Sequence, residues 1–585
     1  MKKWNQLFRL CYLIIGISIS IITIACINSS NVLSEKMGYK LSSLTYQGSG
    51  TESDPYLIYT AEELQGLKDD TEQNYYKLMN DIDLSSIESF EPIGTNQQKP
   101  FKGIFDGNGK EIINLSISKN YIKTDDNKFK YFENIGLFGY INGGEVKNLG
   151  IKNASIILNN ANVKFIGTLA GIATNGTKIE NVYAEIEIQL TNCISSIGGL
   201  IGYSNANITK CFTNANIDVT AQNTDDRINI GGLIGENYNI DYTAKWYEEN
   251  EYGNITNSYS NSKIELSCIN NEVVSERIQV GGLLGYNQKG NIENVYAISK
   301  INVFTKSDFK NVSKVGGLVG YNFYEKNKEN NAKNSYYSAE IITRRNLDRE
   351  MISDRSIKQG EERTLKQMLS ESNYSNWDFN NIWQIEPNEG SLPYLINNKN
   401  EEIMSSKLQK RITKQEDLIN IYNKLDQLNY EGQGTQENPY LIKTAEQLQG
   451  IERLNLKGKY YYKLANDIDA STIDNFIPIG RTIGFDGILD GDNYTISNLT
   501  INSDEEFTGL FSFINGGRVK NINIDNINVN ATYSGNYSYV GGMCGYNIGD
   551  IENVKIEGKI KNTGTSINLY LGGVLGYNNV SVKKA

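Results

Sequence analysis

The sequence contains no histidine, and this absence excludes several kinds of active site. A Ser-His-Asp triad, a Cys-His pair and an HExxH zinc peptidase site each require an imidazole, so none of them can form in this chain. Carboxylate pairs, Lys, Tyr, Arg and bound Ca²⁺ remain as catalytic options. We interpret the chain as non-catalytic, and nothing in the sequence indicates a cofactor.

Basic charge and proline are also scarce. The 585 residues include 57 Lys and Arg against 68 Asp and Glu, which gives a formal net charge of −11. Nucleic-acid binding requires a concentrated basic surface, so we expect no nucleic-acid partner. The chain has 7 prolines but 54 glycines, and asparagine is abundant. Because Gly and Asn serve turns with positive φ, this composition predicts many short strands, and the length predicts two or more units.

Cysteine is infrequent, with six residues in the whole chain. Two of them lie near the N-terminus, and the other four show no metal-ligand spacing: Cys193, Cys211, Cys268 and Cys544. We predict that these four are small buried apolar residues rather than a disulfide framework. A single bridge between Cys193 and Cys211 is the alternative.

The N-terminus has the pattern of an export signal. Lys2, Lys3 and Arg9 precede an uncharged apolar run that reaches about residue 27. This pattern predicts a signal peptide over residues 1–26, followed by a flexible linker over residues 27–44. Ala25 followed by Cys26 resembles a bacterial lipoprotein signal, which implies acylation of Cys26 and a membrane anchor at the cell surface. Ordinary cleavage with secretion and an uncleaved anchor are the alternatives.

A glycine-rich block recurs through the rest of the chain. It has the form Gly, a small or apolar residue, two apolar residues and Gly, and it occurs near residues 136, 167, 198, 231, 281, 316, 509, 541 and 572. Apolar residues alternate on either side of the blocks, which is typical of strands. Short strands separated by Gly and Asn corners predict a chain that turns repeatedly in one direction, so that each coil stacks about 4.8 Å above the last.

A second signature follows each block, consisting of an aliphatic residue, any residue and Asn. Stacking would place these asparagines above one another, where their amides can bond along the stack. We therefore interpret the series as a structural ladder, which Lys210 interrupts; its members are Asn114, Asn148, Asn181, Asn257, Asn294, Asn334, Asn498, Asn521 and Asn553.

The glycine blocks resemble the GLUG motif of bacterial surface proteins, which also occurs in non-catalytic regions of IgA-specific metallopeptidases. The resemblance covers roughly residues 48–394 and 432–577. It implies an all-β fold, a right-handed parallel β-helix, and it says little about function.

The chain divides into two units that begin alike. The predicted boundaries are 45–398 for the first unit with a C-terminal cap, 399–430 for a helical linker and 431–585 for a second, shorter unit. Thr60 with Glu63, and Thr444 with Gln447, predict short capping helices at the start of each unit. Trp377, Phe379 and Trp383 indicate the cap of the first unit. In the linker, a capping box at Thr413 and Glu416 predicts a helix start.

Several carboxylates are candidate Ca²⁺ ligands, namely Asp81, Asp83, Asp106, Asp467 and Asp469. Calcium requires six to eight oxygens from several segments, and these clusters supply too few. We therefore predict turns and no metal site. A carboxylate pair acting on polysaccharide remains the enzymatic alternative.

The longest interval between glycine blocks contains an aromatic insert. Insertions in solenoids project from one face, and aromatic side chains there suit ligand contacts; the candidates are Tyr238, Tyr242, Trp246, Tyr247 and Tyr252. We therefore expect an exported cell-surface scaffold for adhesion or ligand binding, with a host or envelope protein or a glycan as partner. A purely structural envelope protein, or a fragment of a larger surface protein, is the other alternative.

Overall fold

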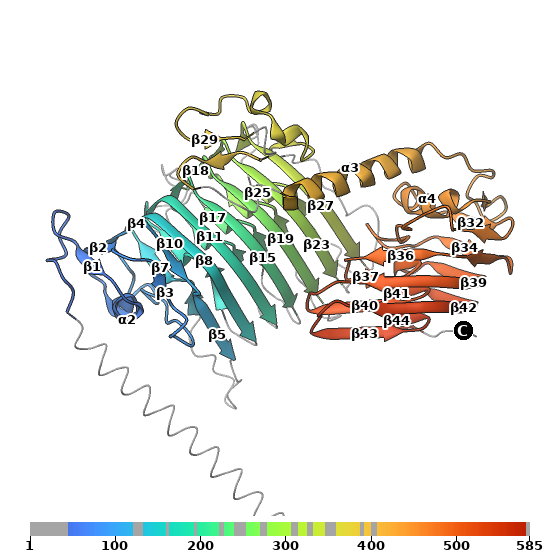
Figure 1. Cartoon of the computed structure of the whole chain (residues 1–585), viewed down its shortest axis with the longest axis horizontal. Coiled ribbons are helices and arrows are strands. Elements are labelled where there is room, and N and C mark those ends of the chain that lie inside the picture. Colours follow the sequence, from blue (N-terminus) through green and yellow to red (C-terminus); the bar gives the residue numbers. More distant parts are fainter. Residues whose placement is uncertain are drawn as a thin grey trace, which may run out of the picture.

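The computed structural model describes residues 45–580, except for 121–132, 160–162, 192–195, 222–226, 239–252, 269–277, 306–313, 324–331, 346–358, 387–390 and 399–405. It confirms the predicted all-β class, because two stacks of parallel strands make up most of the described chain (Figure 1). Cys26, Cys193 and most of the aromatic insert lie outside the described residues. Among the helices that are described, none has the length and apolar composition that a membrane span needs.

The first unit is a β-helix with three parallel sheets. The largest sheet runs through β1 (Tyr56–Ile58), β2 (Tyr75–Leu78), β4 (Ile104–Ile113), β8 (Glu145–Asn159), β11 (Lys178–Thr191), β15 (Phe212–Ala221), β19 (Tyr259–Cys268), β23 (Tyr296–Thr305), β27 (Tyr336–Arg345) and β28 (Glu361–Glu362). Shorter strands pair beside this path, and these are β3 (Ile82–Asp83), β5 (Ser116–Asn120), β14 (Asn207–Thr209), β18 (Ile255–Thr256), β22 (Ile292–Glu293) and β26 (Ala332–Lys333).

The glycine blocks lie where the other two sheets of the first unit meet. One sheet holds β7 (Phe138–Asn142), β10 (Ala170–Thr174), β13 (Ile201–Ser204), β17 (Ile234–Tyr238), β21 (Leu284–Gln288) and β25 (Val319–Phe323). The other holds β6 (Glu133–Ile135), β9 (Val163–Gly167), β12 (Ser196–Gly198), β16 (Ile228–Gly231), β20 (Ile278–Gly281) and β24 (Lys314–Gly316). At Gly231, an added Cβ would lie 1.9 Å from the Ile234 carbonyl oxygen, so this turn admits no side chain.

The core consists of columns of apolar side chains, one from each coil. The clearest column has isoleucine at each level of the large sheet from β5 to β27, and its members are Ile117, Ile156, Ile188, Ile217, Ile264, Ile301 and Ile341. The first six of them are fully buried, and full burial of one such side chain stabilises the fold by about 1.5–3 kcal/mol. The alternation of apolar residues therefore sets the register between coils.

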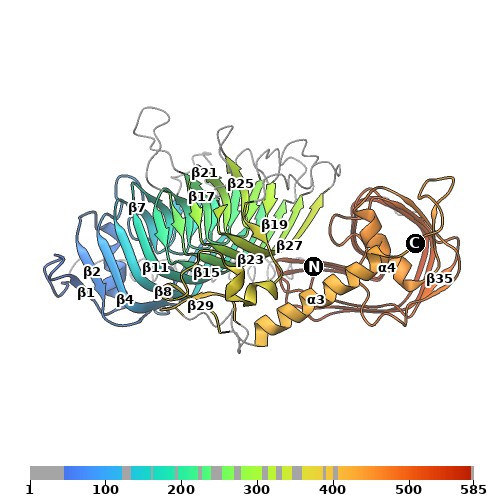
Figure 2. The same ribbon diagram turned by 90° about the horizontal axis from the view of Figure 1, so that it is seen from above.

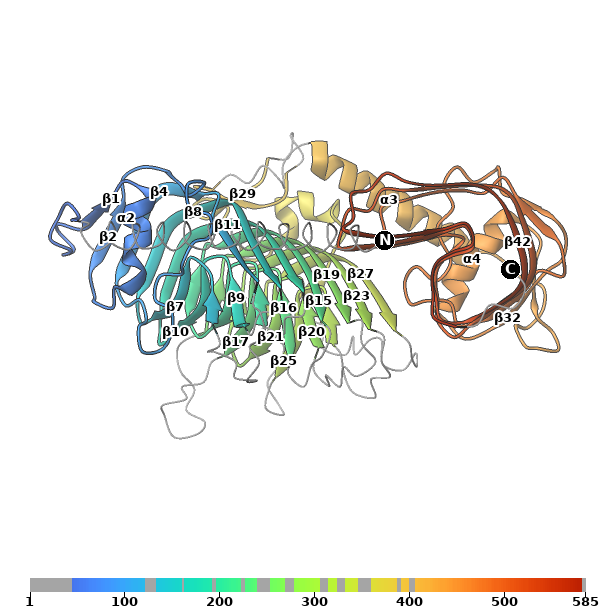
Figure 3. The same cartoon turned by 90° about the horizontal axis from the view of Figure 1, so that it is seen from below.

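The second unit repeats this architecture with fewer coils. Its main sheet contains β31 (Tyr440–Ile442), β32 (Tyr461–Leu464), β33 (Ile468–Asp469), β34 (Ile488–Asp490), β35 (Thr495–Ser497), β36 (Thr500–Ser503), β39 (Arg518–Ala531) and β42 (Asp550–Asn562). The two smaller sheets contain β37 (Phe507–Thr508), β40 (Tyr537–Gly541) and β43 (Asn568–Gly572), and β38 (Phe511–Ile514), β41 (Cys544–Asn547) and β44 (Leu575–Asn578). Figure 3 shows this unit nearly end-on, as a closed loop of strands.

A short helix covers the first coil of each unit. In α2 (Ala61–Gly66), the Thr60 side chain accepts from the Glu63 amide and the Glu63 carboxylate accepts from the Thr60 amide, which forms the capping box. In α4 (Ala445–Asn455), Thr444 caps in the same way, but the Gln447 side chain accepts from the Lys443 amide instead. A 3₁₀ turn, η1 (Leu67–Asp69), follows α2.

The linker forms α3 (Ser406–Asp426), which bridges the two units (Figure 2). The predicted start at Thr413 is wrong, because the helix begins seven residues earlier. Leu408 and Ile412 lie in this first part and are buried against the aromatic segment of the first unit, which stabilises the additional turns. Thr413 is therefore a residue of the helix interior.

The aromatic segment predicted as the cap of the first unit lies along the flank of the large sheet. It includes the 3₁₀ turns η3 (Gln367–Leu369) and η4 (Glu371–Asn373) and the antiparallel pair β29 (Trp383–Gln384) and β30 (Tyr394–Leu395). Trp383 packs on the rings of Tyr259 and Tyr296. These two rings lie on neighbouring coils of the large sheet and stack with their centroids 4.7 Å apart. The segment therefore covers several coils rather than one end.

Candidate functional site

All nine asparagines of the predicted ladder occupy left-handed corners, with φ between 47° and 62°. Non-glycine residues rarely adopt this conformation, and Asn is among the few that tolerate it. At Asn148, the side-chain amide donates to Asp106 at 3.1 Å and its oxygen accepts from Asn181 at 2.9 Å. The repeated Asn therefore serves both the backbone bend and the bonding between coils.

The asparagines form two columns in each unit rather than the single column that the sequence predicted. Asn114 does not stack on Asn148; it donates to Asp83 at 2.8 Å and accepts from Asn153. In the second unit Asn498 likewise donates to Asp469 at 2.9 Å and accepts from Asn526. The reason is that β8 and β39 each bend at two left-handed asparagines, five residues apart, and each bend continues its own column.

Carboxylates begin these columns, and some of them are the candidate Ca²⁺ ligands of the sequence analysis. Asp83 and Asp469 each accept from an asparagine amide, and these bonds lower the pKa of both carboxyls. Asp81 accepts instead from the Glu111 backbone at 2.9 Å. Within the described residues, no group of His, Cys, Asp and Glu side chains is suited to hold a metal ion. The described thiols Cys211, Cys268 and Cys544 are free and buried.

Lys210 interrupts the longer column but keeps the left-handed corner, with φ 54°. The amide of Asn398, which follows the aromatic segment, donates to Asn181 at 2.6 Å. A residue more than 200 positions away thereby bonds to the asparagine that precedes the interruption. The polar groups of the column are used by the fold itself, so the ladder offers no ligand site.

Of the predicted insert residues, Tyr238 alone is described, and the other four lie outside the described residues. Tyr238 is 7% exposed, at the end of β17. Its ring stacks between Tyr203 and Tyr286, with both centroid distances 5.2 Å, and its hydroxyl accepts from Arg227. Tyr238 is therefore one member of a column of aromatic rings on successive strands.

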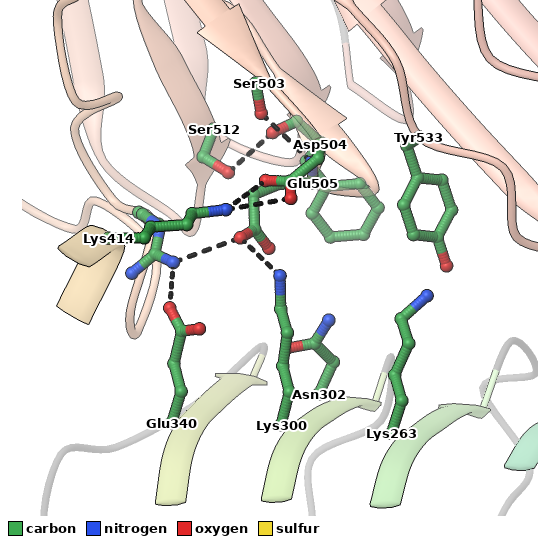
Figure 4. A network of polar contacts seen from close by, with 12 residues as sticks. Lys263, Lys300, Asn302, Glu340, Lys414, Ser503, Asp504, Glu505, Ser512 and Tyr533 are labelled. Carbon is green, nitrogen blue, oxygen red and sulfur yellow. Dashed lines mark hydrogen bonds and ion pairs between the residues drawn. The ribbon is translucent and has the colours of Figure 1, made fainter. Parts of the chain in front are cut away.

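A contact that the sequence did not predict joins the two units, and we call it the junction. Figure 4 shows Lys300 and Glu340 of the first unit pointing toward Glu505 of the second. Lys300 Nζ lies 2.9 Å from Glu505 Oε1, and Arg481 pairs with both Glu340 and Glu505. Lys414 of α3 pairs with Asp504 at 2.8 Å. Arg481 and Glu505 side chains are 10% and 6% exposed, so these charges are withdrawn from water.

Apolar and carboxylate contacts complete the junction. Phe304 at the end of β23 packs edge-on against Phe507 and Phe513, with centroid distances of 5.4 and 6.0 Å. Nearby, the Tyr533 hydroxyl donates to the Glu265 carboxylate. Asp218 accepts from the backbone N–H of Asn536 at 3.1 Å. Burial and the neighbouring Glu265 raise the pKa of Asp218 to about 7. The second unit covers this carboxylate pair, which argues against a role for it in polysaccharide hydrolysis.

Two cavities flank α3 at the junction. The larger, of about 990 Å³, lies between α3 and the outer face of β23 and β27, and the smaller, of about 760 Å³, lies between α3 and the second unit. Lys410, Lys414, Leu418 and Asp504 line both cavities, which we call together the junction groove. Its residues come from segments more than 200 positions apart, such as Ile298 and Asp504, and follow no repeat, which explains why no sequence pattern indicated it.

Comparison with known proteins agrees with the repeat. The model of the GLUG motif matches residues 277–302, which include all of β20, β21 and β22 and most of β23. The chain carries the GLUG motif. Halomucin from Haloquadratum walsbyi is 37% identical over 172 residues, which are 28% of this chain and 2% of halomucin. Immunoglobulin A1 protease from Streptococcus pneumoniae is 29% identical over 248 residues, 42% of this chain and 10% of the protease.

A solved structure from Bacteroides ovatus is 22% identical and covers 60% of this chain and 95% of that protein, with a TM-score of 0.41. The chain spans a small fraction of the length of halomucin and of the protease. The resemblance to GLUG-motif proteins is therefore confirmed for the repeat region, and the activities of these larger proteins lie outside what is shared.

The corner asparagines give a first prediction. Asn148→Ala removes two hydrogen bonds and places alanine at a positive φ, so we expect a loss of about 2–4 kcal/mol in the free energy of unfolding. Asn148→Gly keeps the backbone conformation, so a loss of about 1–2 kcal/mol is expected. Urea unfolding measures both values, with exposed Asn397→Ala as the control. Equal losses for Ala and Gly would show that the backbone bend is not the reason for Asn.

Asp218 gives a second prediction. A carboxyl whose pKa is higher in the folded state reduces stability as the pH rises from its unfolded value of 3.8 through about 7. Asp218→Asn removes this titration, so the variant should match the parent near pH 4 and exceed it above pH 7. At about 1.4 kcal/mol per pKa unit, the upper limit of the gain is about 4 kcal/mol. Unfolding curves across this pH range test it, with exposed Asp474→Asn as control; a gain independent of pH would contradict the assignment.

Proposed function

We propose that the protein is an exported, non-catalytic cell-surface scaffold that binds a glycan in the junction groove. The observation that carries the proposal is the larger cavity beside α3, about 990 Å³, which is at the upper end of the range for ligand sites. The signal-like N-terminus and the absence of histidine support export and a non-catalytic role. The similarity of part of this chain to an immunoglobulin A1 protease is consistent with export.

The chemistry of the groove suits a sugar chain. Leu418 and Ile419 of α3 supply apolar surface, on which the carbon face of a sugar ring can pack. Arg363 and Lys410 line the same cavity and can donate to hydroxyls. Arg363 is held by its ion pair with Glu361 at 3.1 Å and by the Tyr336 ring, 3.7 Å below its guanidinium. Its Nη1 atom is buried and has no hydrogen-bond partner within the described structure.

Preorganisation supports binding at this place rather than elsewhere. Gln415 of α3 donates to Ser338 at 3.1 Å and accepts from the Leu365 amide at 2.8 Å, so the helix is fixed against the sheet. Arg411 of α3 also donates to Asn261 on β19, the strand beside β23, at 2.8 Å. Groove walls that are already ordered lose little conformational entropy when a ligand binds.

A glycan array with the full chain tests the proposal. Leu418→Trp fills part of both cavities, so affinity for any glycan found should fall by at least about tenfold, while Lys424→Ala, on an exposed position of α3 outside the groove, should leave it unchanged. Equal affinity for the parent and Leu418→Trp would reject the groove as the site.

The insert predicted from the sequence is tested in the same assay. If the groove is the binding site, deletion of residues 239–252 leaves the affinity unchanged. A loss of binding on deletion, with no effect of Leu418→Trp, would assign the ligand to the aromatic insert instead.

A further inference from the structure

A third cavity adjoins the junction groove on the outer face of the large sheet, and we call it the shelf. It has a volume of about 440 Å³ and lies between the first part of α3 and strands β11, β15, β19 and β23. Lys300 and Arg411 line both the shelf and the larger cavity beside α3. A ligand that passes these two residues therefore occupies both cavities.

The charged residues of the shelf are mostly basic. Among the described residues that line it, Lys263, Lys300 and Arg411 are basic and Glu185 alone is acidic. The described lining of the larger cavity has five basic and four acidic residues, so its charges nearly balance. The whole chain has 57 Lys and Arg against 68 Asp and Glu, so its composition does not predict this local excess of cations. The shelf therefore favours a ligand that carries negative charge.

The two lysines of the shelf hold ion pairs within the protein and still line the cavity. Lys263 pairs with Glu265 at 2.9 Å while its side chain is 39% exposed, and Lys300 pairs with Glu505. Neither of these carboxylates belongs to the lining of the shelf. The lysines occupy the same register position on β19 and β23 and point the same way, as Figure 4 shows. Each ammonium has three donors, so one ion pair does not exhaust it.

The large sheet fixes Arg411 at the shelf. Arg411 Nη1 donates to the Asn261 side chain at 2.8 Å, and the Asn261 amide donates to Asn214 on the neighbouring strand at 3.3 Å. A guanidinium presents its N–H donors in a planar fork that matches the two oxygens of a carboxylate. Asn216 is exposed on the same strand as Asn214, and its amide can bond to hydroxyl groups. The shelf therefore combines donors for a carboxylate with an amide for hydroxyls, which are the two kinds of polar group on an acidic sugar.

We propose that the glycan of the junction groove is an acidic oligosaccharide, and that the carboxylate of a uronic or sialic acid residue in it binds at the shelf beside Arg411 and Lys263. This inference rests on the proposed function, because it names the class of glycan for the same groove. The rest of the chain passes Arg411 into the larger cavity, where Leu418 and Ile419 supply apolar surface.

Matched pairs of glycans test the inference by titration calorimetry with the full chain. Oligosaccharides that contain galacturonic, glucuronic or sialic acid are each compared with the same oligosaccharide after reduction of its carboxyl groups to alcohols. At least one acidic oligosaccharide should bind about tenfold or more tightly than its reduced form, and the difference should shrink as the salt concentration rises. Equal affinities within every pair, or binding of neutral oligosaccharides alone, would overturn the inference and leave the proposed function intact. Absence of binding by every glycan would reject both.

Two variants change the charge of the shelf in opposite directions. Arg411→Gln removes a cation but keeps a donor for Asn261, so affinity for the acidic oligosaccharide should fall by at least about tenfold and affinity for the reduced form should stay the same. Glu185→Gln removes the acid, so the acidic oligosaccharide should bind more tightly, a gain that misfolding cannot produce. Lys424→Gln removes a cation from an exposed position of α3 outside the cavities and serves as the control. Unchanged affinity in both shelf variants would overturn the shelf as the site of the carboxylate.

Discussion

The structure depends on one geometric constraint: each coil must return to the same place one strand spacing above the previous coil. A corner residue therefore recurs at the same position in coil after coil, with the same backbone conformation. Asn satisfies the constraint because it tolerates a positive φ and its amide bonds to the next level. Lys210 keeps the corner without the amide, and Asn398 from a distant segment bonds at that point. The repetition in the sequence therefore has a structural cause.

The same stacking aligns charged side chains in columns on the outside of the large sheet, and the junction forms its ion pairs with these side chains. Lys263, Lys300 and Glu340 occupy one column on successive strands. Two lysines one coil apart repel each other, and carboxylates beside them offset this: Glu265 pairs with Lys263 and Glu505 of the second unit pairs with Lys300. Buried ion pairs contribute little net stability, but removal of one partner costs about 3–5 kcal/mol. The junction therefore favours one arrangement of the units over others.

Much of the fold could be predicted from the sequence, because periodic apolar residues and Gly corners act locally. The capping box at Thr60 is equally local. Prediction failed where tertiary packing decided the outcome: Thr413 has the residues of a cap, yet burial of Leu408 and Ile412 extends α3 past it. The repeat pattern places Asn114 in the wrong column because the sequence does not show that one strand bends twice. The junction groove has no sequence signal, since its residues, such as Lys300 and Asp504, share no spacing.

The ion pairs and aromatic contacts of the junction hold the two solenoid units in one arrangement, which gives the groove beside α3 a fixed shape. Small-angle X-ray scattering measures this most directly, on the full chain at concentrations where its mass is that of one molecule. If the junction holds the units together, the measured profile agrees with the arrangement of the two units in Figure 1. A profile that requires separated units in variable orientations would contradict it.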